Sequence, residues 1–193
     1  MYSWSIIFKS INLGDFKMDM LDTLVNNLDN INNNRKYLFD TDGLKVYLTD
    51  AFDCAYGAGM EAAFASIDAD NGERVIYINE AMLYSDFVQG ALWHEAGHHH
   101  YMHDEDVSEQ MRNWNQLTHE AKKDILAKGL CTEINYVNEM EADSYAADHG
   151  YAATLIKFLE KYLAIYESSN AVPERDLVGI RNRVAALRDR LAA

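Results

Sequence analysis

The chain has 193 residues, of which 49% are hydrophobic and 11% aromatic, so it can bury a hydrophobic core and is neither disordered nor fibrous. Its formal net charge of -14 argues against nucleic acid and anionic membranes as partners, because phosphate contacts need clustered Lys and Arg. No apolar run approaches the roughly 20 residues that cross a bilayer, and Cys54 and Cys131 have no CxxC spacing. We therefore expect a single cytoplasmic domain over 1–193, whose oligomeric state the sequence leaves open.

The first part of the chain is predicted to hold one helix and a small sheet. Apolar residues at helical spacing indicate an amphipathic helix over 17–30, ending in an Asn-rich run. Leu44–Thr49 is rich in strand formers and bounded by turn residues, so we predict a strand there. The segment from Met60 to Ile67 fits a strand or a loop. The turn Asp70-Asn71-Gly72 then leads into a second strand, Arg74–Asn79.

The rest of the chain is predicted to be mainly helical. Glu80–Tyr84 connects the sheet to a helix from Asp86 to about His103, with Ser85 as its N-cap. A polar stretch follows, in which Trp114 and Leu117 are expected to point inward and Gly129 to break the helix. The further predicted helices are 131–148, which Gly150 caps, Tyr151–Tyr166, and Glu174–Leu191, which starts after Pro173.

The helix from Asp86 contains the pattern His94-Glu95-Ala96-Gly97-His98. Side chains four apart share a helical face, so His94 and His98 can present two imidazoles to one metal ion. Glu95 can then stand beside a metal-bound water as a general base. Such a pattern arises by chance in on the order of one chain in a hundred of this length. The surrounding sequence therefore has to show whether the pattern marks a metal site. His99, His100 and His119 are predicted to be exposed.

A catalytic zinc ion needs three protein ligands and one open position, so the two histidines require a partner. We choose Glu139, in Glu139-Met140-Glu141-Ala142-Asp143. Asp143 lies one turn beyond Glu139 on the same face, where it can accept the free N–H of a zinc-bound histidine. Glu141 points roughly the opposite way on a regular helix and is predicted to make a surface contact.

The HExxH pattern at His94–His98 and the later ExxxD pattern at Glu139–Asp143 resemble those of the gluzincin metallopeptidases. Their flanks are most similar to the CAAX prenyl endopeptidase and heat-shock membrane protease group, including its small soluble relatives, the minigluzincins. GERVIYINEAML is similar to that group's turn, edge strand and connection, and EMEADSYAADHGY to its ExEADxxAxxxGY segment. The resemblance covers about residues 44–191 and includes the family's extra histidine, here His103, five residues after the second ligand.

The resemblance implies an α+β, zincin-like fold: an N-terminal helical segment (about 1–40), a small mixed sheet with an edge strand over the active-site helix (41–103), and a helical part with the third ligand (104–193). It implies that His103 supports the site. In a zincin, an exposed strand near the metal can bind an extended peptide by adding it to the sheet. The candidate strand for this role, for which a plain half-buried strand is the equal alternative, is Arg74, Val75, Ile76, Tyr77, Ile78 and Asn79.

The chain departs from the family in two respects. It has no membrane helices, which removes the reason to expect prenylated or membrane substrates. Many family members carry a His-Pro pair near the C-terminus, but this chain has Val172-Pro173, so the transition-state donor of that segment is missing. Five residues could replace the missing donor: Tyr136, Tyr145, His149, Arg181 and Arg183.

The predicted function is zinc-dependent hydrolysis of a peptide or protein substrate, with one Zn²⁺ held by His94, His98 and Glu139 and with Glu95 as general base. One alternative is a regulatory protease that cleaves a phage-type repressor, which shares an HExxH followed by a glutamate-bearing helix, although its usual Leu-Met-Pro segment is absent. The other alternative is a zinc-binding pseudoenzyme or interaction module. The intact Glu95 argues against that second alternative.

Overall fold

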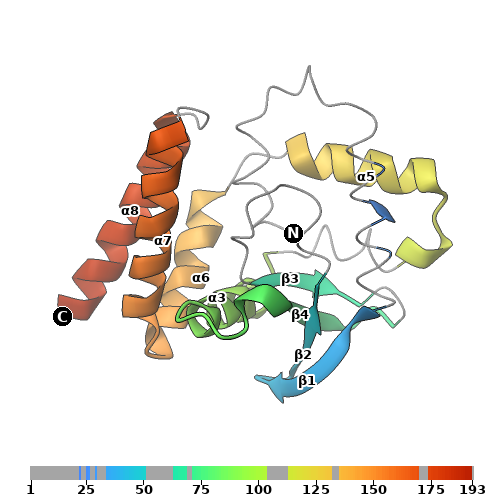
Figure 1. The fold of residues 1–193 in the computed structure, drawn as a ribbon, viewed down its shortest axis with the longest axis horizontal. Helices are drawn as coiled ribbons and strands as arrows, with labels where there is room; N and C mark the ends of the chain where they lie inside the picture. Colours follow the sequence, from blue (N-terminus) through green and yellow to red (C-terminus); the bar gives the residue numbers. More distant parts are fainter. Residues whose placement is uncertain are drawn as a thin grey trace.

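The computed structural model describes residues 34–50, 63–68, 71–103, 113–131, 135–169 and 174–192, together with Asp22, Val25, Asn26 and Asp29. Within these residues the fold is α+β, as predicted (Figure 1). The strands are β1 (Lys36–Thr41), β2 (Leu44–Thr49), β3 (Ala63–Ile67) and β4 (Arg74–Asn79). The α-helices are α3 (Val88–His100), α5 (His119–Cys131), α6 (Tyr136–Asp148), α7 (Ala152–Ser169) and α8 (Glu174–Ala192), and short 3-10 helices cover Glu80–Met82 and Trp114–Gln116. The helix predicted over 17–30 lies largely outside the described residues, as does Cys54.

The four described strands form one mixed sheet in the order β1-β2-β4-β3. β2 and β4 run parallel, whereas β1 pairs with β2 and β3 with β4 in antiparallel fashion. The predicted strands over Leu44–Thr49 and Arg74–Asn79 are confirmed, and the segment that fitted a strand or a loop is a strand over Ala63–Ile67.

The prediction that Arg74–Asn79 forms the edge of the sheet is wrong, because β4 lies between β2 and β3. Five of its six residues are buried, from Val75 to Asn79. A continuous apolar run of this kind is typical of a strand that is covered on both faces. Among the described strands, β3 lies at the edge next to β4, and it packs against α3.

β1 occupies the end of the segment that was predicted to be helical, which corrects the boundary at residue 40. It forms a hairpin with β2 through Asp42 and Gly43, whose φ angles of 50° and 75° are those of a type I′ turn. The Tyr145 hydroxyl of α6 donates a hydrogen bond to Asp42 and ties the hairpin to the helical part.

α3 covers the sheet with an apolar face. Val88, Leu92 and Ala96 pack against strand residues such as Val46 and Ile76 in one buried core. The helix begins at Val88, two residues later than predicted, and Phe87 rather than Ser85 occupies its N-cap position. The Ser85 carbonyl instead accepts the N–H of Val88 in the preceding turn.

α6, α7 and α8 stand side by side at one end of the molecule, and α3 lies between them and the sheet (Figure 1). α3 and α6 approach closely at Gly97, where a Cβ atom would lie 2.8 Å from the Cα of Ala142. One expectation was wrong: Gly129 lies within α5 and does not break it. Among the described residues, no helix is long and apolar enough to cross a membrane.

Candidate metal centre

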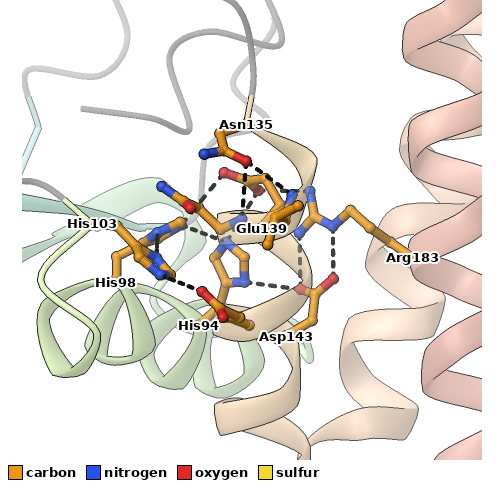
Figure 2. Close-up of polar contacts among 10 residues, drawn as sticks. His94, His98, His103, Asn135, Glu139, Asp143 and Arg183 are labelled. Carbon is orange, nitrogen blue, oxygen red and sulfur yellow. Dashed lines mark hydrogen bonds and ion pairs between the residues drawn. The ribbon is translucent and has the colours of Figure 1, made fainter.

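Three buried side chains from two helices converge at one point, as Figure 2 shows: His94 and His98 from α3 and Glu139 from α6. The Nε2 atoms of His94 and His98 lie 3.1 Å apart. The Glu139 carboxylate lies 3.5 Å from each of them, Oε2 from His94 and Oε1 from His98. The three residues predicted as metal ligands are therefore brought together, and Glu95, between the histidines in sequence, is buried as well.

The spacing of these atoms fits a metal ion of the size of zinc. With Zn–N and Zn–O bonds of about 2.0–2.1 Å, two ligand atoms at tetrahedral positions are about 3.3 Å apart. The two histidine nitrogens lie 3.1 Å apart, and each lies 3.5 Å from a different oxygen of Glu139, so these separations are close to that value. Oε1 of Glu139 is buried and takes part in no hydrogen bond among the described residues, so it is available to a cation.

The start of α6 fixes where Glu139 lies. The side chain of Asn135 caps the helix by accepting the N–H groups of Val137 and Asn138. The carbonyl of Asn135 accepts the N–H of Glu139, which therefore lies one turn into the helix. The positive end of the helix dipole favours a carboxylate in that first turn.

Asp143 lies beside His94, on the same face of α6 as Glu139. Its Oδ1 lies 2.9 Å from Nδ1 of His94, the ring nitrogen on the side away from the cluster. A carboxylate at this nitrogen keeps the proton on Nδ1 and leaves the Nε2 lone pair for a metal. Asp143 is buried, so this contact is shielded from solvent.

Arg183 reaches the same carboxylates from α8 (Figure 2). Its Nε and one terminal nitrogen donate to the two oxygens of Asp143 at 2.6 and 2.9 Å, and its other terminal nitrogen lies 2.8 Å from Oε2 of Glu139. Each guanidinium nitrogen thus faces a carboxylate oxygen. Of the five candidate donors Arg183 is the one that touches this cluster, but its geometry is that of a residue that positions Glu139.

The other candidate donors have their polar groups engaged elsewhere. The Tyr136 hydroxyl donates to Asp176 at 2.9 Å, and the Tyr145 hydroxyl donates to Asp42. His149 uses Nδ1 to contact the Tyr145 carbonyl and stacks on Trp93. Arg181 forms exposed ion pairs with Glu167 and Glu174.

The remaining histidines of α3 differ in their surroundings. His100 is exposed, as predicted, but the prediction for His99 is wrong: this side chain is buried, and its Nε2 contacts the Val75 carbonyl at 2.9 Å. Arg74 donates in turn to the His99 carbonyl at 2.9 Å. His99 faces the sheet because it lies on the apolar side of α3. Its contacts with Val75 and Arg74 hold the C-terminal end of α3 against β4.

Burial and charge oppose one another at the cluster. Burial would lower the pKa of His94, but Asp143 and Glu139 outweigh it and raise the pKa to about 10. Burial would raise the pKa of Glu139, but Arg183 and His94 lower it to about 2. Burial dominates at His98 and lowers its pKa well below the usual value. The two carboxylates thus favour a proton on His94, and a metal ion that binds at its Nε2 competes with that proton.

A scan against protein-family models and searches of curated proteins and of solved structures found no match for this chain. The function is therefore inferred from the geometry of the site. The spacing of His94, His98, Glu139 and Asp143 was visible in the sequence. The role of Arg183 was missed, because its partners Asp143 and Glu139 lie at least 40 residues away on another helix.

Proposed function

We propose that the chain is a zinc-dependent metallopeptidase with a zincin-like fold and a gluzincin set of ligands. The observation that supports this best is the convergence of His94, His98 and Glu139 at separations of 3.1 and 3.5 Å. Three protein ligands from a helical HExxH and a second helix are typical of a catalytic zinc site, which keeps one position open. A closed structural site usually contains cysteine, and none of these ligands is one.

In the proposed reaction each residue has a separate task. His94, His98 and Glu139 would hold the ion, and Asp143 and Arg183 would orient His94 and Glu139. A bound zinc ion lowers the pKa of a water molecule and polarises a carbonyl group. The Glu95 carboxylate would accept a proton from the attacking water and deliver it to the leaving amine.

The proposed binding site for the peptide is the edge strand β3 rather than β4. One side of β3 pairs with β4 in antiparallel fashion, and on the other side the described residues provide no partner strand. β3 also packs against α3, the helix that carries the histidines. An extended substrate could add to this edge through main-chain hydrogen bonds and lie along the metal centre.

The first test is the metal content of the purified chain, measured by elemental mass spectrometry. We expect about one zinc per chain, and strongly reduced zinc in His94→Ala and Glu139→Gln. Asp148→Ala is the matched control, because it removes an acidic side chain from the same helix as Glu139 but one that pairs with Arg190. A wild-type chain that stays free of zinc after incubation with the metal would refute the proposal.

The second test is hydrolysis of a mixture of unmodified peptides by the zinc-loaded chain, followed by mass spectrometry of the products. Glu95→Gln should retain zinc but lose cleavage by at least about 100-fold, because general-base catalysis contributes about that much or more. Equal zinc content and equal absence of cleavage in wild type and Glu95→Gln would favour the zinc-binding pseudoenzyme instead.

A further inference from the structure

His98 contacts a second histidine on the side away from the metal cluster. Its Nδ1 lies 3.1 Å from Nδ1 of His103 (Figure 2). Nε2 of His103 lies 2.8 Å from Oε2 of Glu141 on α6. The His103 side chain is only 6% exposed, whereas Glu141 is 49% exposed. Three groups thus form a continuous chain of contacts from the buried cluster to the surface.

The direction of each hydrogen bond in this chain follows from elementary chemistry. Two Nδ1 atoms can bond only if one carries a proton and the other offers a lone pair. His98 points its Nε2 at the cluster, so a metal ligand at that position carries its proton on Nδ1 and donates to His103. His103 must then accept at Nδ1 and carry its proton on Nε2, where the Glu141 carboxylate, which only accepts, receives it.

The backbone at the end of α3 places His103 beside His98. The N–H of Met102 bonds to the His99 carbonyl, the N–H of His103 bonds to the His98 carbonyl at 3.0 Å, and Met102 has a φ of 56°. These are the two bonds of a Schellman motif, which joins residues five apart. The two imidazole rings consequently lie 5.3 Å apart.

We propose that Glu141 is a positioning residue that acts on the ligand His98 through His103, a role that rests on the proposed metal centre. His94 has a carboxylate, Asp143, directly at its Nδ1. His98 has instead the imidazole of His103, which in turn contacts the Glu141 carboxylate at the surface. Glu141 acts on the metal only through His103, although the sequence pattern indicated no more than a surface contact for it.

The proposal is tested by measuring the zinc affinity of variants in competition with a chromogenic chelator. His103→Ala should weaken zinc binding about 10–100-fold, the usual effect of losing the partner of a metal-bound histidine. Glu141→Ala should weaken it less, about 3–10-fold, because His103 remains. Glu141→Gln, which keeps an acceptor oxygen, should recover part of that loss, and the double variant should be no weaker than His103→Ala alone.

Asp148→Ala is again the control, because it removes the same charge from the same helix while its partner is Arg190. Its affinity should stay within about twofold of wild type, since exposed charges at a distance are screened. Equal losses in Glu141→Ala and Asp148→Ala would overturn the proposal, as would additive losses in the double variant.

A second measurement does not depend on the metal: the ¹⁵N NMR shifts of the His103 ring in the metal-free chain. We expect the Nε2–H tautomer in wild type and a mixture of tautomers in Glu141→Ala, at unchanged helical content. A proton on Nδ1 of His103 in wild type would overturn the proposed role of Glu141. If the wild-type chain binds no zinc, the proposed function is overturned. If both His103→Ala and Glu141→Ala bind zinc as strongly as wild type, only the proposed positioning role is overturned.

Discussion

Arg183 faces two buried carboxylates at once, those of Glu139 and Asp143, and is itself buried. Removing one partner from a buried ion pair leaves the remaining charges without compensation, which costs about 3–5 kcal/mol. We therefore expect Arg183→Met to lower the free energy of unfolding of the metal-free chain by about that amount. Arg183→Lys should lower the free energy of unfolding by less than Arg183→Met, because an ammonium group keeps the charge but cannot bind Asp143 in a bidentate fashion and also reach Glu139. Urea unfolding followed by circular dichroism measures the difference.

Arg181, on the same helix, is the matched control for this prediction. It also pairs with two carboxylates, Glu167 and Glu174, but these pairs are exposed. Exposed pairs contribute about 0–1 kcal/mol, so Arg181→Met should leave the unfolding free energy nearly unchanged. Similar losses in the two Arg→Met variants would contradict the view that burial makes Arg183 important.

At the scale of elements, the close approach of α3 and α6 depends on Gly97. A Cβ atom there would lie 2.8 Å from the Cα of Ala142 and 3.0 Å from its carbonyl oxygen, which are backbone atoms that cannot rotate away. We expect Gly97→Ala to lower the unfolding free energy by about 1–3 kcal/mol, the usual cost of overpacking. Gly97→Ala should also weaken zinc binding, because the added methyl group would push apart α3, which carries His94 and His98, and α6, which carries Glu139.

Gly90 in the same helix tests whether the effect of Gly97→Ala comes from packing. A Cβ atom at Gly90 would lie 3.1 Å from Cγ2 of Thr154, a side chain that can rotate. Alanine also favours a helix over glycine by about 1 kcal/mol, so Gly90→Ala should be close to neutral. An equal loss of stability and zinc affinity in both variants would show that any added methyl group disturbs α3.

The end of α3 carries backbone strain that can be removed. Met102 is 53% exposed and adopts a φ of 56°, a region that costs a residue with a Cβ atom about 1–2 kcal/mol. Met102→Gly should stabilise the chain by about 0.5–1 kcal/mol, after the larger unfolded-state entropy of glycine is subtracted. Met102→Ala, which keeps the Cβ atom, should give no such gain in urea unfolding. A gain of the same size in both variants would indicate that the Met side chain, and not the backbone, is unfavourable.

The sequence predicted what depends on short spacings, and it missed what depends on contacts between distant segments. His94, His98 and the Glu139–Asp143 pair follow from the helical repeat, and the turn at Asn71-Gly72 marks the start of the strand Arg74–Asn79. The central position of β4 was not predictable, because a strand's neighbours are set by the whole sheet. The contacts of Arg183 with Asp143 and of His103 with Glu141 span 40 and 38 residues, so no local pattern reveals them.

At the scale of the whole molecule, a metal ion at His94, His98 and Glu139 would connect α3, which packs on the sheet, to α6 in the helical part. Binding to the folded chain alone stabilises it by about 2.7 kcal/mol when free zinc is at 100 times the dissociation constant. For a chain of this size that should raise the Tm by roughly 5–11 °C, measured by differential scanning calorimetry before and after removal of zinc by a chelator. Glu139→Gln should show no such zinc-dependent shift, and calcium, which prefers six or more oxygen ligands, should not replace zinc in wild type. A shift of the same size in Glu139→Gln would place the stabilising ion elsewhere in the molecule and separate its binding from the proposed centre.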